Sequence, residues 1–273
     1  MAEGCSAECH RQRKRRINQT VGFQTKNKMI VLILAAGYGT RLYPLVKDTP
    51  KALLDINGRP LLNYILDKIE QVDGLNGVIV VTNNKFHKNF EHWKKDLGKF
   101  VEPIEIINDG TDTPEDRLGS IGDINFVLRQ RCIDDDLLVI GGDNLFDYSL
   151  EDYVRFSKTK NPSVVIGLYD IHDLTQATKF GVVKLDTDGK IISFEEKSQQ
   201  PQSTLIAMCC YYLPRKVLST VRDYLSETKR SDTSGDYIRW LTQKYNVYGF
   251  QFTGRWYDIG SIESYKEAVN KFK

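Results

Sequence analysis

Hydrophobic residues in the first half of the chain occur in short unbroken runs, separated by segments in which they recur every three or four positions. An unbroken run is typical of a parallel strand buried on both faces of a sheet, and the wider spacing is typical of an amphipathic helix. The pattern predicts strands at 30–35, 77–82, 103–107 and 137–140. It predicts helices at 85–97, at 121–131 and from Pro60 to a stop at Asp73 and Gly74.

Strands and helices are also predicted after residue 143, but in another order. Two strand-like segments, 181–186 and 190–196, are joined by a turn at 187–189, which favours an antiparallel hairpin. Further strands are expected at 163–169, 205–213 and 247–252, and further helices at 149–159, from 214, at 235–245 and from 261. The pattern indicates an α/β protein with a Rossmann-like, doubly wound mixed sheet and a small antiparallel lobe from about 160 to 215.

The first 28 residues differ from the rest in composition. They contain five basic residues between 11 and 16 and little apolar periodicity. We therefore expect a disordered basic tail over 1–28 and one folded domain over 29–273. The tail lacks the interleaved aromatic residues of many nucleic-acid-binding segments, so a solvated tail is favoured over a nucleic-acid contact.

Composition narrows the classes of partner. The chain has 38 Lys and Arg against 36 Asp and Glu, and a net charge of +2 provides no general attraction to nucleic acid or to an anionic membrane. No apolar run approaches the roughly 20 residues of a membrane span, and no secretory signal pattern is present, so we expect a cytosolic protein. The five cysteines include no CxxC pair, and we expect free thiols rather than a zinc site.

The loop after the first predicted strand carries the first candidate chemistry. Gly37, Gly39 and Thr40 are small enough to let backbone N–H groups approach a polyphosphate closely. The loop is neither a dinucleotide-binding fingerprint, which needs glycine where Leu42 stands, nor a Walker A loop. Taken alone, the two glycines are equally compatible with an ordinary tight turn.

The loop is part of a longer string that resembles a known family. The chain resembles the sugar-1-phosphate nucleotidylyltransferases, which include glucose-1-phosphate thymidylyltransferase, glucose-1-phosphate uridylyltransferase and mannose-1-phosphate guanylyltransferase. The resemblance covers 29–273 and rests on motifs in family order: LAAGYGTRLYP at 34–44, TPKALL at 49–54, GGDN at 141–144, FGVV at 180–183, EEK at 195–197 and WYDIG at 256–260.

The resemblance implies a reaction and its reacting groups. A nucleoside triphosphate and a sugar 1-phosphate would combine to a nucleotide-sugar with release of pyrophosphate, with Mg²⁺ as cofactor. Arg41, Lys51 and Asp143 would be the catalytic residues, and Asp143 with Asp258 would bind the metal. From the residues alone, Arg41 and Lys51 could instead be solvated surface charges. Asp143 and Asp258 could each be a helix cap or a turn former.

The resemblance also distributes the substrates. The nucleotide would lie on Ala35, Ala36, Gly37, Gly39, Thr40 and Arg41, with its base near Asn108 and Gly119. The sugar phosphate would lie on Gly181, Glu196 and Lys197 in the antiparallel, sugar-binding lobe. A homo-oligomer, either a dimer or a tetramer, is also implied.

Several positions depart from the family pattern. Val46 stands where many members have Thr, Asn108 replaces the Gln with which thymidylyltransferases contact their base, and Cys209 stands where members often have Gly. Asp123 introduces an acid where a small residue is usual. We expect each of these positions to lie around the substrate and none of them at its phosphates. The reaction type is therefore better supported than the identity of the base or sugar.

Two other functions stay open. One is a cytidylyltransferase that acts on a phosphorylated alcohol such as phosphocholine; retention of Gly181, Glu196 and Lys197 favours a sugar phosphate instead. The other is a regulatory homologue that binds a nucleotide-sugar without turnover, against which the presence of all four charged site residues argues.

Overall fold

A computed structural model describes residues 28–98, 100, 102–229 and 233–272 of the chain. The predicted basic tail therefore lies outside the described residues, except for Lys28. The first strand, β1, begins directly after it at Met29.

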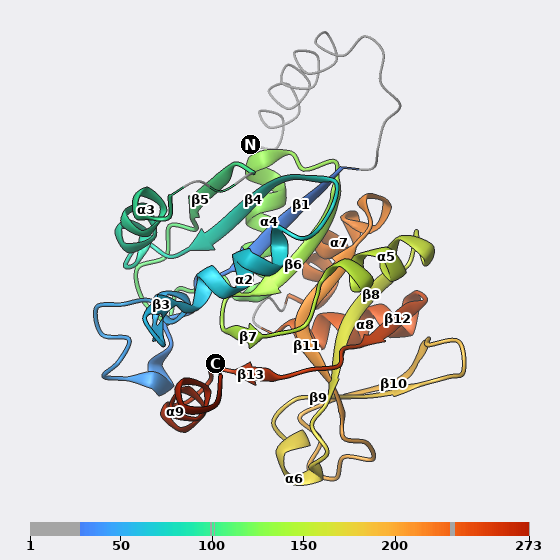
Figure 1. Cartoon of the computed structure of the whole chain (residues 1–273). Helices are drawn as coiled ribbons and strands as arrows, with labels where there is room; N and C mark the ends of the chain where they lie inside the picture. The colour runs from blue at the N-terminus through green and yellow to red at the C-terminus, as the bar shows by residue number, and fades with distance from the viewer. Residues whose placement is uncertain (1–27, 99, 101, 230–232, 273) are drawn as a thin grey trace, which may run out of the picture.

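Four parallel strands form one half of the central sheet. They lie in the order β6-β1-β4-β5, and every neighbouring pair is parallel. Their bounds are β1 Met29–Leu34, β4 Leu75–Thr82, β5 Ile104–Asn108 and β6 Asp136–Gly141. These are the four strands predicted from unbroken apolar runs, and helices cover both of their faces (Figure 1).

Antiparallel strands extend the same sheet. The long strand β11 (Leu205–Leu213) pairs antiparallel with β6, with β8 (Val164–Asp170) and with β9 (Gly181–Leu185). At the edges, β10 (Ile191–Glu196) completes the expected hairpin with β9, and β12 (Val247–Gln251) lies parallel to β8. In the described part of the chain, nine strands thus belong to one mixed sheet. The predicted antiparallel lobe is a continuation of this sheet and not a separate layer.

Helices form a layer on each side of the sheet. One apolar core contains residues of α2 (Leu61–Ile69), α3 (His87–Asp96), α5 (Glu151–Thr159) and α9 (Ile262–Lys271). The other contains residues of α4 (Ser120–Arg131), α7 (Ser219–Thr228) and α8 (Ser234–Lys244). Strand β1 serves both cores because its side chains alternate, so that Val31 and Ile33 face the first core and Leu32 faces the second.

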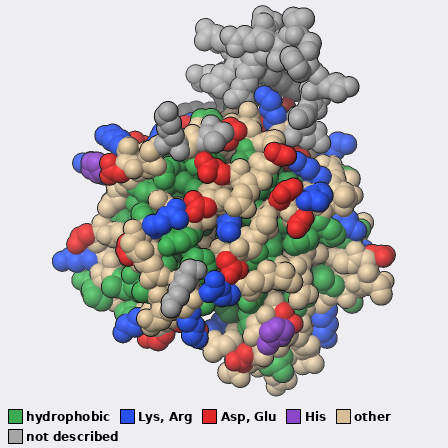
Figure 2. All heavy atoms as spheres, in the orientation of Figure 1, with side chains coloured by type: hydrophobic (Ala, Val, Ile, Leu, Met, Phe, Trp, Pro, Cys, Tyr) green, Lys and Arg blue, Asp and Glu red, His purple; other side chains and the backbone are tan. Residues whose placement is uncertain are grey.

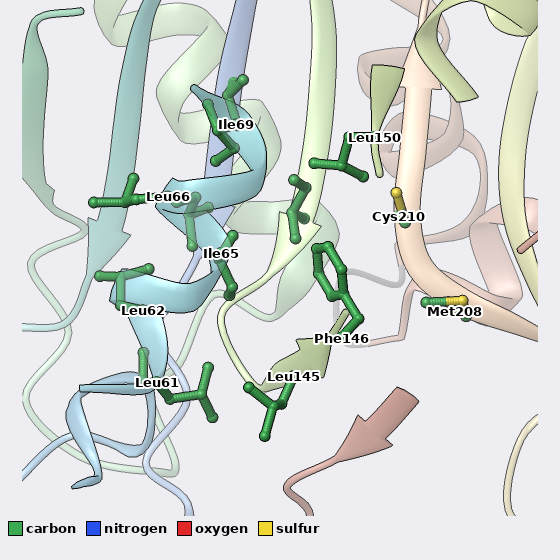
Figure 3. Close-up of a cluster of buried hydrophobic side chains, with 14 of the residues drawn as sticks. Leu61, Leu62, Ile65, Leu66, Ile69, Leu145, Phe146, Leu150, Met208 and Cys210 are labelled. Atoms are coloured by element: carbon green, nitrogen blue, oxygen red, sulfur yellow. The ribbon is translucent and has the colours of Figure 1, made fainter. Parts of the chain in front are cut away.

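Helix α2 shows how the hydrophobic spacing determines packing. Its five apolar residues, Leu61, Leu62, Ile65, Leu66 and Ile69, are almost fully buried. Figure 3 shows this stripe beside Leu145 and Phe146 of the short strand β7 (Asn144–Phe146). Burial of a leucine-sized side chain contributes roughly 1.5–3 kcal/mol, so the stripe anchors the segment that leads into β7.

Several short elements were not predicted. Strand β7 pairs antiparallel with β13 (Trp256–Asp258), and β2 (Asp55–Ile56) pairs with β3 (Arg59–Pro60). The single-turn helix α6 (Leu174–Ala177) is also new. Elements this short contain too few residues to display a period, and tertiary pairing decides where they form.

Other expectations concern the thiols and the surface. Cys209 and Cys210 are free, as expected, but Cys132 is disulfide-bonded, which corrects the expectation for that residue. Within the described residues, every helix is too short or too polar to cross a bilayer. On the face drawn in Figure 2, basic and acidic side chains are interspersed.

Candidate active site

The glycine-containing loop leaves the carboxyl end of β1, in the middle of the parallel strands. The backbone N–H of Ala35 still donates to Val81 of β4, at 2.9 Å, and the loop then runs into the short 3₁₀ helix η1 (Thr40–Leu42). Gly39 has φ +62°, a left-handed conformation that favours glycine, and a Cβ there would lie 3.3 Å from the buried side chain of Val46. Val46 therefore supports the bend of the loop, which corrects the expectation that none of the positions departing from the family pattern lies at the predicted phosphate contacts.

A cavity of about 360 Å³ opens over this loop. Its walls combine the loop with the start of the 3₁₀ helix η2 (Lys51–Leu53), the end of β6 and two further segments near Pro114 and Gly260. Among its lining residues are seven that the sequence predicts for the site: Ala35, Gly37, Gly39, Thr40, Arg41, Lys51 and Asp143. Gly37 has open space where a side chain would stand, so the backbone is accessible from the cavity.

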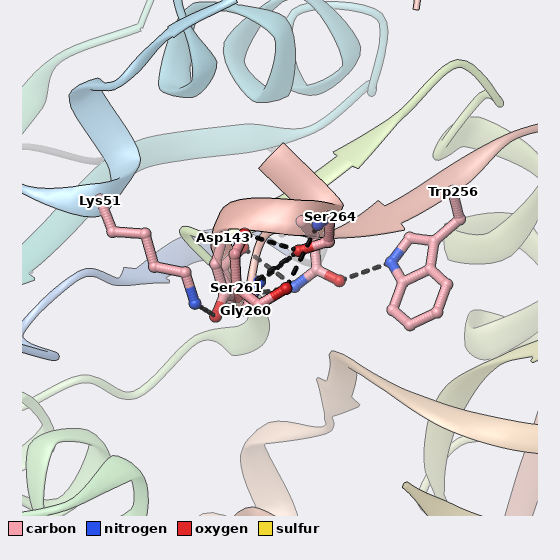
Figure 4. Close-up of polar contacts among 8 residues, drawn as sticks. Lys51, Asp143, Trp256, Gly260, Ser261 and Ser264 are labelled. Carbon is pink, nitrogen blue, oxygen red and sulfur yellow. Dashed lines mark hydrogen bonds and ion pairs between the residues drawn. The ribbon is translucent and has the colours of Figure 1, made fainter. Parts of the chain in front are cut away.

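An ion pair lies at one wall of the cavity. Nζ of Lys51 donates to Oδ2 of Asp143 at 2.6 Å, and Figure 4 shows the lysine reaching the carboxylate from a separate segment. The Lys51 side chain is 18% exposed and that of Asp143 34% exposed, so both can meet a ligand. Asp143 precedes the strand β7 and not a helix, so it is no helix cap.

Asp258 reaches the same place from the far end of the chain. It lies opposite Asn144 in the β13–β7 pair, and the next backbone N–H, of Ile259, donates to the carbonyl of Asp143 at 3.0 Å. Burial, followed by the charge of Asp143, raises the pKa of Asp258 to about 6, while Lys51 and Arg41 act in the opposite direction. The four predicted charged residues thus interact electrostatically at one site.

Two neighbouring interactions hold Asp258 in place. The indole N–H of Trp256 donates to the side-chain oxygen of Asn144 at 2.7 Å and fixes the pairing of the two short strands. Helix α9 is capped by Ser261, whose hydroxyl accepts from the backbone N–H of Ser264 (Figure 4). The helix-cap interpretation of Asp258 is therefore wrong, and its carboxylate is left for other contacts.

The two carboxylates suit a hard divalent cation. Mg²⁺ binds to one or two protein carboxylates and completes its shell with phosphate oxygens and water. The repulsion that raises the pKa of Asp258 is what such a cation would relieve. No cluster of three or more His, Cys, Asp or Glu side chains able to hold a metal occurs among the described residues, so a metal here would depend on phosphate oxygens as well.

The predicted sugar-side residues form a second group. Glu196, at the end of β10, lies against two glycines, Gly181 and Gly235. A side chain at either glycine would crowd Oε2 of Glu196, because an added Cβ would lie 3.1 Å from it at Gly181 and only 1.9 Å from it at Gly235. Burial raises the pKa of Glu196, and the charge of Lys197 lowers it. The Lys197 side chain is 60% exposed, with its Nζ 3.8 Å from Oε1 of Glu196.

Cys209 of β11 lies beside the first group of charged residues. A Cβ on Gly141 would lie 3.0 Å from the Cβ of Cys209. Burial, followed by the charge of Asp143, raises the pKa of this thiol to about 12, and Asp258 contributes in the same direction. Cys209 is thus a neutral thiol beside the two carboxylates at the point where the parallel and antiparallel strands meet.

Comparison with known proteins identifies the family. The model of the nucleotidyl transferase family matches residues 30–273, which is most of the chain. This chain belongs to the nucleotidyl transferase family.

Curated relatives agree with this assignment. Over 245 residues the chain is 29% identical to the bifunctional protein GlmU of Methanocaldococcus jannaschii, covering 89% of the chain and 54% of the relative. Over 259 residues it is 28% identical to the glucose-1-phosphate adenylyltransferase of Clostridium novyi, covering 89% and 66%. This nucleotidyl transferase chain therefore spans between about half and two thirds of the length of these relatives.

Solved structures of nucleotidyl transferases share the fold. A Bacillus anthracis protein assigned as a glucose-1-phosphate thymidylyltransferase, solved with sucrose, aligns with a TM-score of 0.73 at 25% identity, over 89% of this chain and 94% of that one. A UDP-glucose pyrophosphorylase solved with UDP-glucose aligns with a TM-score of 0.74 at 22% identity, over 90% and 98%. The mixed sheet predicted from the sequence is confirmed.

Three predicted nucleotide contacts stand apart from the cavity of this nucleotidyl transferase chain. Ala36 is buried, and its carbonyl accepts from Nδ2 of Asn83 at 2.8 Å. The side chain of Asn108 is bonded to Asn84 and to the backbone N–H of Gly110, and Gly119 is the N-cap of α4. Since none of the three is among the described cavity-lining residues, the base contacts of Asn108 and Gly119 stay predictions.

Sequence reasoning gave no role to several residues that shape the site, among them Asn83, Gly260 and Gly235. Asn83, fully buried, holds the glycine-containing loop at 35–40, called the phosphate loop below after its proposed role, through Ala36. Gly260 lines the cavity beside Asp258, and Gly235 makes room for Glu196. Asn83 directly follows a predicted strand, and this position could have indicated its role. Nothing in the sequence near Gly235 indicates that it faces Glu196.

Proposed function

We propose that this protein is a Mg²⁺-dependent sugar-1-phosphate nucleotidylyltransferase. It would convert a nucleoside triphosphate and a sugar 1-phosphate to a nucleotide-sugar and pyrophosphate. The observation that carries the proposal is the Lys51–Asp143 ion pair at the wall of the phosphate-loop cavity. A cation and a carboxylate that could bind a metal lie there beside backbone that could receive phosphates.

The proposed reaction is an in-line displacement at the α-phosphorus of the triphosphate. An oxygen of the sugar phosphate forms the new P–O bond, and pyrophosphate leaves with the electrons of the broken one. Such a reaction needs positioning and charge neutralisation more than a protein nucleophile. The loop at 35–40 would position the triphosphate through its backbone, and Arg41 would neutralise it from the adjacent 3₁₀ helix.

Lys51 would balance the negative charge that gathers on the reacting phosphates. Its ammonium is held toward the reaction site by Asp143 and comes from a different segment than Arg41. Asp143 and Asp258 would hold Mg²⁺, which, when bound, supplies charge stabilisation to the phosphate oxygens. This arrangement uses each of the four charged residues once.

The residues near Glu196 favour a sugar phosphate as the second substrate. A carboxylate in a half-buried place, with glycines on both sides, can accept hydrogen bonds from hydroxyl groups that approach closely. The neighbouring Lys197 is exposed enough to pair with a phosphate. A cytosolic location and a homo-oligomer are further parts of the proposal and rest on the sequence and its family resemblance.

The test is a pyrophosphate-release assay with purified protein. It combines Mg²⁺, each common nucleoside triphosphate and a panel of sugar 1-phosphates, with Asp143→Asn as the inactive variant. Asp152→Asn is the matched control, because Asp152 is an exposed acid on α5 that pairs with Arg155 and is not part of the cavity. Release that needs one substrate pair and Mg²⁺, and that is lost only in Asp143→Asn, is the expected result.

Two other results would replace the proposal. Release with phosphocholine or another alcohol phosphate, but with no sugar phosphate, would identify the cytidylyltransferase alternative. Tight binding of a nucleotide-sugar without release from any pair would identify a non-catalytic homologue.

A further inference from the structure

Two acidic side chains are buried together behind the phosphate loop. Asp109 directly follows β5, Asp123 lies in the first turn of α4, and they are only 7% and 6% exposed. Within the described part of the chain, Oδ2 of Asp109 and Oδ1 of Asp123 are buried without a hydrogen-bond donor. Two neighbouring buried carboxyl groups cannot both be charged without a large cost in desolvation and repulsion.

One proton on the pair removes that cost. Burial raises the pKa of Asp123 to about 8, and the charge of Asp109 and a hydrogen bond with Asp109 act in the same direction. Asp109 is the titratable residue that acts on Asp123. Burial also raises the pKa of Asp109, but hydrogen bonds from Thr111 lower it, and Asp116 is the other acid that acts on it. At neutral pH the proton therefore resides on Asp123 and is donated toward Asp109.

The acid pair is connected to the phosphate loop through a single turn. Oδ1 of Asp109 accepts from the backbone N–H of Thr111 at 2.7 Å and from its hydroxyl at 2.8 Å. The hydroxyl of Tyr38, a buried residue of the loop that also lines the cavity, donates to Oγ1 of Thr111 at 3.3 Å. Asp112 and Asp116 are the other acids that act on Tyr38.

We propose that Asp123 is a positioning residue for the phosphate loop. A proton shared with Asp109 holds the turn at 109–111, and this turn, through Thr111 and Tyr38, holds the loop in its nucleotide-binding shape. The use of this loop by a nucleoside triphosphate rests on the proposed function. Asp123 does not line the cavity, so it acts only through these neighbours. Its position in the first turn of a helix favours the charged form, but the partial charge of a helix end is a smaller effect than burial beside a second carboxylate.

The arrangement makes nucleotide binding sensitive to alkaline pH. Below about pH 8 the pair carries one negative charge, and above it two charges repel across the same buried space. If only the protonated pair holds the loop in shape, the apparent affinity falls with the protonated fraction, and KM for the triphosphate rises about tenfold between pH 7 and pH 9. Asp123→Asn keeps a permanent N–H donor toward Asp109, so its KM is expected to stay constant.

The first experiment needs no substrate. Hydrogen–deuterium exchange of peptides covering 35–46 is compared at pH 7 and pH 9 for the wild-type protein, Asp123→Asn and Tyr38→Phe, after correction for the exchange rate of an unfolded chain. We expect loop protection to fall about tenfold in the wild type, to stay constant in Asp123→Asn, and to be low at both pH values in Tyr38→Phe. Asp223→Asn removes an exposed acid of α7 and should behave as the wild type.

The second experiment measures KM and kcat for the triphosphate over the same pH range in the same proteins. The expected change is in KM, with kcat at saturating triphosphate equal in the wild type and in Asp123→Asn. Equal loss of loop protection in the wild type and Asp123→Asn would overturn the inference. If the exchange result is as expected but no triphosphate is turned over, the proposed function fails and the coupling stands.

Discussion

Among the described residues, two pairs of interacting acids, Asp143 with Asp258 and Asp109 with Asp123, are neutralised in different ways. Asp143 lines the cavity over the glycine-containing loop and is bonded to Lys51, and Lys51 and Arg41 act to lower the pKa of the neighbouring Asp258. Asp109 and Asp123 lie behind the loop, and burial and Asp109 alone set the pKa of Asp123. In the proposed function the first pair would bind a metal and meet substrate phosphates, whereas the second pair is enclosed and holds a proton.

The difference shows that acid pairs of the same composition can serve separate purposes within one fold. A pair with cations nearby stays available for ligands, because opposite charges favour the ionised form. A pair without them takes up a proton and becomes a structural link. The following experiments test this distinction, from the largest expected effect to the smallest.

Removing the cation of the first pair should have the largest effect. Lys51→Met leaves Asp143 without its partner and the reacting phosphates without a charge, and we expect kcat to fall about 10²–10³-fold, the size seen when one preorganised charge-stabilising group is lost. Pyrophosphate release at saturating substrates measures it. Lys179→Met, which removes an exposed lysine bonded to Gln176, is the control. A kcat within a few-fold of the wild type would show that Lys51 only pairs with Asp143.

Neutralising one acid in each pair should separate function from stability. The pKa of Asp258 is raised from 3.8 to about 6, so the native protein holds this proton more tightly than the unfolded chain, and stability is lost as pH rises from about 4 to about 6. Asp258→Asn should therefore raise the free energy of unfolding at pH 7, by at most about 3 kcal/mol, and still abolish most activity.

Asp123→Asn should be more stable as well, but active. The pKa of Asp123 is raised to about 8, so its stability loss extends over about pH 4 to 8, and the gain from the substitution should grow across that range and then level off. Denaturant unfolding of both variants at several pH values, with activity measured in parallel, checks the pair of predictions. Stability differences that do not change with pH would mean that neither acid holds its proton as described.

The sugar side should respond separately from both acid pairs. An alanine at Gly235 would place its Cβ where Oε2 of Glu196 now lies, so Gly235→Ala should displace that carboxylate. We expect KM for the sugar phosphate to rise about tenfold, the value of one misplaced hydrogen bond, with KM for the triphosphate unchanged. Gln243→Ala, an exposed change on the same helix, is the control. Equal increases in both KM values would indicate a general disturbance of α8.

The smallest effect is expected from the second support of the phosphate loop. Asn83→Ala removes the hydrogen bond to Ala36 and the acceptor for the backbone N–H of Phe86, and should lower the free energy of unfolding by about 1–3 kcal/mol and raise KM for the triphosphate a few-fold. Asn89→Ala, which removes a more exposed bond to the carbonyl of Asp48, is the comparison. A change in stability without any change in KM would separate Asn83 from the loop's function.

Much of the fold could be predicted because its signals are local. The parallel strands and the helix at 61–69 follow from apolar spacing alone, since a strand or helix must bury the residues that it presents on one side. The glycine-containing loop and Asp143 follow predicted strands, and the carboxyl ends of parallel strands meet at one edge of a sheet. Asp143 could therefore be placed at this edge from the pattern alone, whereas the family resemblance placed Arg41 and Lys51 beside it.

The sequence by itself determined the class of fold, the family and seven of the residues that line the cavity over the glycine-containing loop, because each is encoded in short segments with their own pattern. The family resemblance already placed Asp258 with Asp143, and the tertiary structure showed that the pairing of two very short strands brings them together. Only the tertiary structure decided that Gly235 faces Glu196 and that Asp123 is enclosed with Asp109. These contacts join segments far apart in the chain, and their energies depend on burial and distance, which no local pattern contains.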